Sequence, residues 1–254
     1  MIRMEGVSRA FQRTGGGPVF ALRDLNLEVR KGETMALLGP SGCGKTTTLR
    51  IVNRLLEPTS GHVFVDGKDT SQMDVVRLRR RMGYVVQSGG LFPHLTVRRN
   101  LSLLCELEKW PKERISARVD ELLSLVGLPP AEFRDRYPAE LSGGQRQRVG
   151  VARALMLDPE ILLMDEPFGA LDPITRTKLQ QEFKDLERLV AKTIVIVTHD
   201  LHVAFTLGDR IALLRNGELV QVGTPSELQD QPADDWVRNF LQRQGDPNTN
   251  GDES

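Results

Sequence analysis

The residues with the clearest chemical potential lie between positions 39 and 47. Residues 39–46 follow the pattern Gly-x-x-x-x-Gly-Lys-Thr. Glycines let consecutive backbone N–H groups turn inward around an anion, and a helix that follows adds the positive end of its dipole. This spacing is that of the P-loop, which cradles nucleotide phosphates. We therefore expect ATP to contact Gly39, Pro40, Ser41, Gly42, Cys43, Gly44, Lys45, Thr46 and Thr47.

Within this loop the lysine and the first threonine have separate roles. The Lys45 ammonium is expected to contact the β- and γ-phosphates, and the Thr46 hydroxyl is expected to ligate Mg²⁺. A glycine-rich turn with a surface lysine is the alternative. A strand-like run before the loop and a helical run after it favour the phosphate-binding interpretation.

Two carboxylates follow a second apolar run, residues 161–164. An acid at the C-terminal end of a buried parallel strand lies where α/β sheets bind ligands. Asp165 is expected to hold Mg²⁺, and Glu166 is expected to polarise an attacking water. Two carboxylates before Pro167 would also suit a simple turn, but the P-loop upstream favours the catalytic interpretation.

The elements that must position these residues follow an α/β rhythm. In the first third, strands are expected over 19–29, 33–38 and 62–65, and a helix over 45–55 that ends before Pro58. Between residues 95 and 128 the pattern changes to helical periodicity, and we interpret residues 88–157 as a helical lobe inserted into the α/β core.

From residue 160 the α/β rhythm resumes. Apolar runs at 161–164 and 193–197 are typical of parallel strands buried on both faces. We further expect helices over 173–190, 200–207 and 234–242, and strands over 210–214 and 218–222. One domain is therefore expected over residues 1–243. Residues 244–254 are polar and are expected to be a disordered tail.

Composition excludes several classes of protein. Lysine plus arginine total 34 and aspartate plus glutamate total 34, so no global field attracts nucleic acid, and no nucleic-acid partner is expected. The arginines between 77 and 81 are typical of a solvated helix face. Two cysteines do not make a disulfide framework, which fits a reducing cytosol. The longest apolar runs are too short to span a bilayer, so we expect this chain to lie in the cytoplasm.

A second anion site is indicated by Leu141-Ser142-Gly143-Gly144-Gln145, which precedes a helical run. A plain helix N-cap is the alternative interpretation. With this segment the chain resembles the ATPases of ABC transporters, whose signature motif lies between the two Walker motifs. The resemblance implies an α/β, RecA-like P-loop NTPase core with an antiparallel β subdomain and an inserted helical subdomain. It also implies nucleotide contacts from Ser142, Gly143, Gly144 and Gln145.

Further motifs of that family follow in its order. Phe11 resembles the aromatic residue that stacks on adenine, although a core role is also open. Gln87 resembles the glutamine that reaches Mg²⁺ and the attacking water. Asp172 resembles the D-loop aspartate, and His199 resembles the switch histidine at the γ-phosphate. Each residue alone fits a local polar role, but their order favours the family interpretation.

The resemblance also implies an assembly. In the family two subunits pack head to tail as a homodimer, and the Ser142 loop of one would cover the ATP held by Lys45 of the other. The partners implied are integral-membrane permease subunits and, through them, an extracytoplasmic solute-binding protein. The chain would then lie at the cytoplasmic face of the membrane.

Four longer stretches resemble the importers of osmoprotectants, which are quaternary amines such as glycine betaine, carnitine and choline. They are residues 53–61, 90–97, 172–176 and 232–236. Two alternatives remain open. One is an importer ATPase for another small solute, such as an amino acid. The other is a soluble ABC ATPase outside transport, which the neutral charge and the compact helical lobe disfavour.

Overall fold

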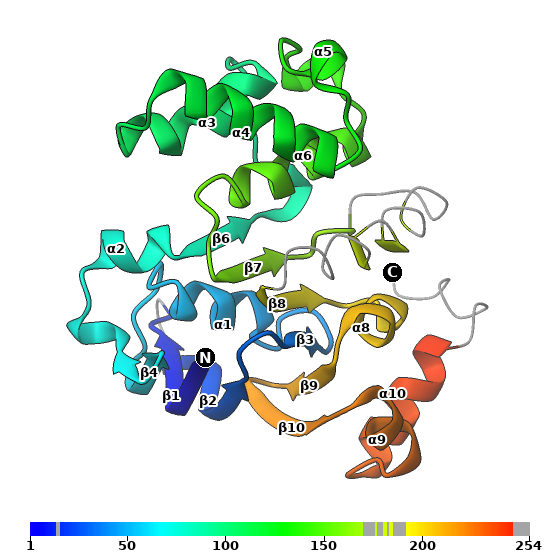
Figure 1. The fold of residues 1–254 in the computed structure, drawn as a ribbon. Coiled ribbons are helices and arrows are strands. Elements are labelled where there is room, and N and C mark those ends of the chain that lie inside the picture. The colour runs from blue at the N-terminus through cyan, green and yellow to red at the C-terminus, as the bar shows by residue number, and fades with distance from the viewer. Residues whose placement is uncertain (14–15, 170–175, 177–179, 182, 185–191, 246–254) are drawn as a thin grey trace. The chain divides into compact units, whose positions relative to one another are not determined.

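The computed structural model describes residues 1–13, 16–169, 176, 180–181, 183–184 and 192–245 (Figure 1). They belong to two compact units. The first unit is Met1–Val75 with Thr193–Ser254, and the second unit is Val76–Lys192. The chain thus leaves the first unit after Val75 and returns to it at Thr193.

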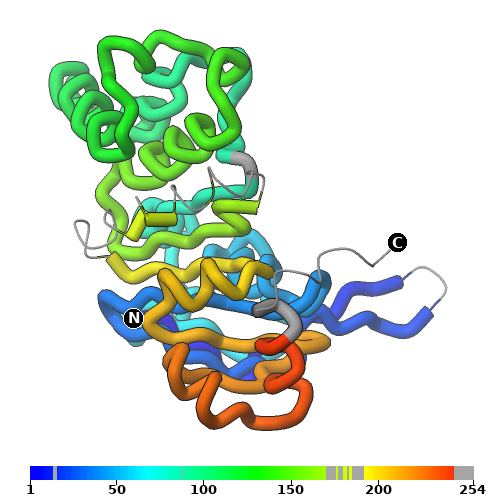
Figure 2. Tube along the Cα trace, turned by 90° about the vertical axis from the view of Figure 1, so that its right-hand side faces the viewer, coloured from blue at the N-terminus to red at the C-terminus, as the bar shows by residue number. Residues whose placement is uncertain are grey.

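An antiparallel sheet of the first unit has the strand order β2-β1-β4-β5. Its strands are β1 (Ile2–Phe11), β2 (Val19–Val29), β4 (Ser60–Val65) and β5 (Lys68–Asp69). The sequence predicted β2 and β4 but not β1. In Figure 2 the ends of β1 and β2 that flank residues 14–15 extend as a two-stranded ribbon, drawn in blue.

The other strands of the first unit lie in the order β10-β9-β3-β8. They are β3 (Thr34–Leu38), β8 (Thr193–Thr198), β9 (Arg210–Arg215) and β10 (Glu218–Gly223). β3 is parallel to both β8 and β9, and every residue of β3 and β8 is buried. Burial on both faces explains why these two strands are continuous apolar runs.

Three helices cover one face of this sheet: α8 (Leu201–Leu207), α9 (Pro225–Asp230) and α10 (Asp235–Gly245) (Figure 1). Ala36 and Leu38 of β3 pack in one apolar cluster with Leu228 of α9 and Val237 of α10. α9 was not predicted. α10 was expected over 234–242 and runs to Gly245, while residues 246–254 of the expected tail lie outside the described residues.

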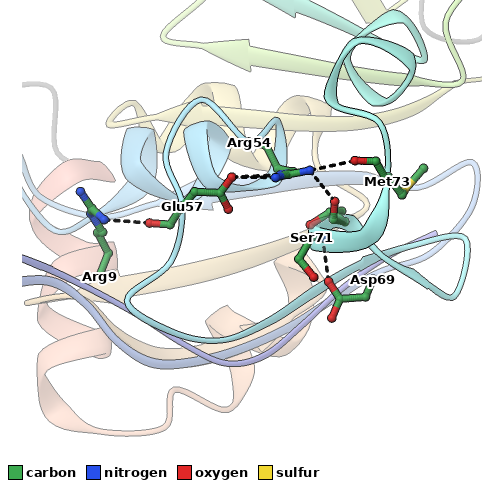
Figure 3. Close-up of polar contacts among 7 residues, drawn as sticks. Arg9, Arg54, Glu57, Asp69, Ser71 and Met73 are labelled. Carbon is green, nitrogen blue, oxygen red and sulfur yellow. Dashed lines mark hydrogen bonds and ion pairs between the residues drawn. The ribbon is translucent and has the colours of Figure 1, made fainter.

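Helix α1 (Lys45–Val52) ends three residues before the predicted position, and Figure 3 shows why. Arg54 has a left-handed backbone, with φ of +47°. Its guanidinium donates to the Glu57 carboxylate at 2.9 and 3.1 Å and to the carbonyl oxygens of Thr70 and Met73 at 2.9 Å each. The Arg9 guanidinium donates to the Glu57 carbonyl oxygen at 2.9 Å. These contacts anchor the chain just beyond α1 to the turn at η1 (Thr70–Gln72).

The second unit holds one parallel strand pair, β6 (Met82–Val85) with β7 (Ile161–Asp165), and most of the helices. Its helices, mostly green in Figure 1, are α2 (Val75–Arg80), η2 (Gln87–Gly89), α3 (Val97–Leu107), α4 (Lys112–Leu125), α5 (Pro130–Phe133), η3 (Pro138–Glu140) and α6 (Gly143–Ala154). The segment 88–157 is therefore helical, as its periodicity indicated, and the arginines from 77 to 80 lie on α2. The strand β6 was not predicted.

The helix expected over 173–190 lies mostly outside the described residues. Those of its residues that are described, namely Arg176, Gln180, Gln181, Phe183 and Lys184, are helical. A search of the described residues finds no helix that is long and apolar enough to cross a membrane.

Candidate functional site

The predicted phosphate-binding loop joins the end of β3 to the start of α1, and its glycines have conformations that other residues would strain. Gly39 has a φ of +152°, and a Cβ there would lie 2.2 Å from the Leu214 carbonyl oxygen. Gly44 has a φ of +104°, and a Cβ there would lie 2.4 Å from the Ala21 carbonyl oxygen. Both contacts are far closer than van der Waals distance, so the loop backbone requires glycine at these two positions.

Among the described residues, no side chain caps the N-terminus of α1. Gly44 is the N-cap residue and provides no side-chain acceptor for the amides of the first turn. Such amides attract an anion, and the helix dipole adds to the attraction. The Lys45 side chain is buried, and its ammonium donates to the carbonyl oxygens of Gly39 at 2.6 Å and Pro40 at 2.9 Å. The loop therefore places a cation and uncapped amides together, which is the donor set that nucleotide phosphates require.

The nine predicted loop residues differ in exposure. Gly39, Cys43, Gly44 and Lys45 are buried and Thr46 and Thr47 half-buried, whereas the tip, Pro40, Ser41 and Gly42, is exposed. Burial raises the pKa of the Cys43 thiol, an effect that the nearby Lys45 ammonium opposes. Burial is the larger of the two effects, so the Cys43 thiol stays neutral and packs against the loop, with its sulfur 3.8 Å from the Lys45 ammonium.

His199 follows β8 in the same unit, and strand register shows where. Leu38 pairs with Thr198 in the parallel β3–β8 ladder. The residues that come next, Gly39 and His199, therefore leave neighbouring strands at the same edge of the sheet. His199 is exposed at that edge.

Phe11 lies at the end of β1, where it pairs with Val19 of β2. It is 41% exposed, and the Arg9 guanidinium lies 4.7 Å from its ring centre. The core interpretation of Phe11 is therefore wrong. An exposed ring with one face on a guanidinium can offer the other to a planar base.

In the second unit, β7 ends in the two predicted carboxylates. Asp165 is its last residue and is 8% exposed. Glu166 follows with a φ of +46°, a left-handed backbone that is strained for a glutamate. The Gly169 amide donates to the Glu166 carbonyl oxygen at 3.2 Å, which closes the turn. Strained backbone at a strand end is typical of residues whose placement is functional.

Gln87 reaches the same sheet edge as these carboxylates. Val85 of β6 pairs with Met164 of β7 in parallel. Gln87 and Asp165 follow these two residues and therefore lie at the same edge of the sheet. Gln87 opens η2 and is exposed. The second unit thus groups three of the predicted residues, while the first unit groups the loop and His199.

The signature segment begins α6 with a reciprocal cap. The Gln145 amide donates to the Ser142 hydroxyl at 3.2 Å, and the Ser142 amide donates to the Gln145 side-chain oxygen at 2.9 Å. The N-cap interpretation is therefore correct for this chain by itself, and it leaves the Ser142 side chain exposed. Asp172, the remaining predicted residue, lies outside the described residues.

Sequence reasoning did not find Arg9 at the Phe11 ring or Arg153, which contacts the chain just after Gln87. Alternation along β1 could have indicated Arg9, since residues two apart on a strand share a face. Arg153 had no local signal, because its contacts are 63 and 64 residues away in the sequence.

Comparison with known proteins decides the family. The model of the family described as "ABC transporter" matches residues 22–169, from β2 to the turn after Glu166. The chain belongs to the ABC transporter family. The matched region contains the P-loop, Gln87, the signature segment and both β7 carboxylates.

Relatives within the family agree over nearly the whole chain. It is 53% identical to the glycine betaine/carnitine/choline transport ATP-binding protein OpuCA of Bacillus subtilis (strain 168), over 95% of this chain and 62% of that protein. It is 49% identical to the glycine betaine uptake system ATP-binding protein YehX of Escherichia coli (strain K12), over 96% of this chain and 77% of that protein. The chain spans about three fifths of the length of OpuCA.

Solved structures agree on the fold. The ATP-binding cassette MJ0796, in a dimeric post-hydrolysis state bound to ADP and Pi, superposes with a TM-score of 0.79 at 36% identity. The match covers 88% of this chain and 98% of that one. The predicted fold class is therefore confirmed: an ABC-type P-loop NTPase with an antiparallel β subdomain and an inserted helical subdomain.

Proposed function

We propose that this chain binds and hydrolyses ATP as the motor subunit of an importer of quaternary-amine osmoprotectants. One observation carries the ATP part of the proposal. The uncapped start of α1 and the Lys45 ammonium lie together in a loop whose backbone only glycine allows. Uncapped amides beside a buried ammonium suit a triphosphate, and a simple turn would not require them.

The proposed roles follow the chemistry of each group. Lys45 neutralises charge on the β- and γ-phosphates, and the amides of residues 39–47 bind their oxygens. The exposed Phe11 ring stacks on adenine. Hydroxyl, amide and carboxylate oxygens suit Mg²⁺, so Thr46, Gln87 and Asp165 are the residues that would hold it. Mg²⁺ would supply charge neutralisation at the transferred phosphoryl group.

Hydrolysis requires a water that is positioned and polarised. Glu166 accepts a proton from that water, and Gln87 orients it. His199 donates to the γ-phosphate oxygens, where charge develops. The strained backbone of Glu166 supports this assignment, since a carboxylate held by a tight turn loses little freedom when the transition state forms.

The proposed working form is a homodimer. The Ser142 hydroxyl and the amides of Gly143, Gly144 and Gln145 would contact the ATP of the other subunit, and Asp172 would lie at the same interface. Support comes from the MJ0796 cassette, which is dimeric. Closure on ATP and release after hydrolysis would drive integral-membrane permease subunits, at the cytoplasmic face of the membrane, and through them an extracytoplasmic solute-binding protein.

The choice of transported solute rests on the relatives. OpuCA and YehX carry glycine betaine in their names, and a choline transport ATP-binding protein of Bacillus subtilis is 52% identical. A second candidate is the same motor for another solute. A spermidine/putrescine and a sulfate/thiosulfate import ATP-binding protein are still 43% and 45% identical over 95% and 94% of the chain.

Glu166→Gln tests the motor and the solute together. The variant should lower ATP hydrolysis by roughly 10²–10⁴-fold and leave ATP binding intact, because only proton acceptance is lost. Hydrolysis by the purified chain and binding of a fluorescent ATP analogue measure the two. Retention of more than about a tenth of wild-type turnover would contradict the role of Glu166.

Uptake of labelled glycine betaine and choline is then measured in cells that lack this chain and other osmoprotectant systems. Uptake restored by wild type and not by Glu166→Gln is the expected outcome. Normal uptake without complementation would reject the proposed solutes and leave the ATPase proposal standing. Labelled spermidine and sulfate serve as the matched alternatives.

A further inference from the structure

The backbone just after Gln87 lies directly against helix α6. A Cβ on Gly89 would lie 2.6 Å from the Arg146 carbonyl oxygen, and a Cβ on Gly150 would lie 2.9 Å from the Gly89 Cα. Glycine at both positions therefore lets the η2 turn touch the α6 backbone. Because Gln87 opens this three-residue turn, its position is tied to α6.

Arg153 adds a polar link one turn further along α6. Its guanidinium donates to the carbonyl oxygens of Gly89 and Gly90, each at 3.0 Å. Two donors of one planar group on two successive carbonyls fix both the position and the direction of that backbone. A lysine can also donate to carbonyl oxygens, as Lys45 does, but its ammonium lacks the planar fork that fixes the direction of both contacts.

Within the part of the chain that the structure describes, Arg153 makes these contacts without a carboxylate partner. The structure shows no ion pair of Arg153 among the described residues, and its guanidinium is 5.9 Å from the centre of the Phe92 ring. Burial lowers the pKa of this arginine, so its charge is held at a cost in hydration. An apolar side chain could fill the same space, but it would leave the carbonyl oxygens of Gly89 and Gly90 without these two donors.

The segment that follows is held from a second helix. Asn100 of α3 is fully buried, and its side chain accepts from the Phe92 amide at 2.8 Å and donates to the carbonyl oxygens of Phe92, Leu95 and Thr96. Residues 89–96 are thus fixed to α6 at one end and to α3 at the other. These contacts couple the position of this segment to both helices.

We propose that Arg153 is a positioning residue for ATP hydrolysis: by holding the carbonyls of Gly89 and Gly90, it fixes Gln87 and makes Gln87 follow any movement of α6. The proposal rests on the role proposed for Gln87. α6 runs from Gly143 to Ala154, with Ser142 as its N-cap, so one helix connects the signature segment to the contacts that Arg153 makes with the Gln87 turn. A nucleotide contact at one end of α6 would then be transmitted to the water-orienting group at the other.

Steady-state ATP hydrolysis by the full chain tests this. Arg153→Met should lower kcat about 10-fold and change the KM for ATP less than about 2-fold, because Gln87 is misplaced while the binding loop is untouched. Arg153→Lys should lose about 3-fold, since one carbonyl contact remains. Arg148→Met is the matched control. Arg148 lies on the same helix and donates to the Val126 carbonyl oxygen at 3.2 Å, so its kcat should stay within about 2-fold of wild type.

A double-mutant cycle separates positioning from fold stability. In a Gln87→Ala chain, Arg153→Met should lower kcat by less than about 2-fold further, because the group that Arg153 positions is gone. Far-ultraviolet circular dichroism confirms that each variant is folded, and Arg153→Lys carries the test if Arg153→Met does not fold. A full 10-fold further loss, or an unchanged kcat in Arg153→Met, overturns the positioning role. An unchanged kcat in Gln87→Ala overturns the proposed role of Gln87 and this inference with it.

Discussion

Helices α1 and α6 both begin at a glycine-rich segment, yet their first turns are satisfied differently. α1 starts at Gly44, which has no side chain to cap it, beside the buried Lys45 ammonium. α6 starts at Ser142, whose hydroxyl and amide are both engaged by Gln145. The start of α1 is therefore open, without a cap, whereas the start of α6 is closed by a cap that engages the Ser142 and Gln145 amides.

This difference indicates when each helix start can bind an anionic ligand. The donors of α1 are in place in a single chain, so we expect a single chain to bind phosphates there. The Gln145 and Ser142 amides of α6 are committed to the cap, in which the Ser142 hydroxyl accepts, so a ligand that takes the Gln145 amide must replace a contact with a net value of about 1 kcal/mol. We therefore expect α1 to set ATP affinity and α6 to respond only when a second subunit brings its ATP.

The largest expected effect comes from the open helix start. Lys45→Ala removes the charge that the loop holds and should weaken ATP binding by about 10³-fold, the value of two charge-assisted hydrogen bonds. Titration calorimetry with ATP measures this. Ser142→Ala, as the counterpart at α6, should change the affinity of a single chain less than about 2-fold. Equal losses in the two variants would remove the distinction between the helix starts.

Substitutions at two glycines of the loop test whether the available space or the positive φ makes glycine necessary there. Gly39→Ala should lower the free energy of unfolding by about 3 kcal/mol, because its methyl would overlap the Leu214 carbonyl oxygen. Gly42 also has a positive φ, +78°, but a Cβ there meets nothing within 4 Å. Gly42→Ala should therefore cost only about 1 kcal/mol of backbone strain. Urea unfolding measures both, and similar costs would show that space does not matter at Gly39.

The Ser142 cap at the closed start of α6 can be compared with a cap of the same type in the first unit. Thr224 and Glu227 form the same reciprocal cap on α9, with distances of 3.2 and 2.7 Å. Ser142→Ala and Thr224→Ala should each lower the free energy of unfolding by about 1 kcal/mol. Only Ser142→Ala should also lower ATP hydrolysis at saturating ATP. A loss of hydrolysis in Thr224→Ala would mean that destabilisation alone explains the effect of Ser142→Ala.

The smallest expected effect is a dependence of stability on pH, which we expect from the α9 cap and not from the α6 cap. Hydrogen bonds from the Thr224 amide and hydroxyl hold the pKa of Glu227 below its usual value of 4.5. A lowered folded-state pKa stabilises the chain above the unfolded value, and that stability is lost as pH falls through the folded value. The difference in Tm between wild type and Glu227→Gln should therefore shrink from about pH 6 to about pH 3.

Gln145, which does not titrate, has the same place in the α6 cap. The difference in Tm between wild type and Gln145→Ala should stay constant over the same pH range. A parallel decline in both differences would mean that acid acts on the whole fold and not on the α9 cap.

Local signals in the sequence predicted much of this structure. β3 and β8 were expected within one residue of their bounds, because strands buried on both faces are uninterrupted apolar runs. The P-loop and the β7 carboxylates were also found, since their spacing within a few residues determines their chemistry. How the predicted residues act stays a prediction.

The strands and the helix end that the sequence did not predict depend on contacts with residues that are distant in the sequence. The buried residues of β1 include Ile2, Met4 and Val7, and the shift in register between Met4 and Val7 breaks their alternation. β6 has only four residues and is a strand because β7 pairs with it. α1 ends early because Arg54 bonds to carbonyls 16 and 19 residues ahead. Periodicity within a short window cannot report such contacts.

The left-handed backbone of Glu166 has a consequence for how this sequence can change over time. A glycine or an asparagine would adopt a φ of +46° with less strain, so selection for a stable fold alone would favour either of them there. A glutamate at this turn is therefore a cost in stability, which the activity proposed for Glu166 would offset. In a lineage that no longer needs the activity, position 166 should be among the first of the site residues to drift, and it should drift towards glycine or asparagine.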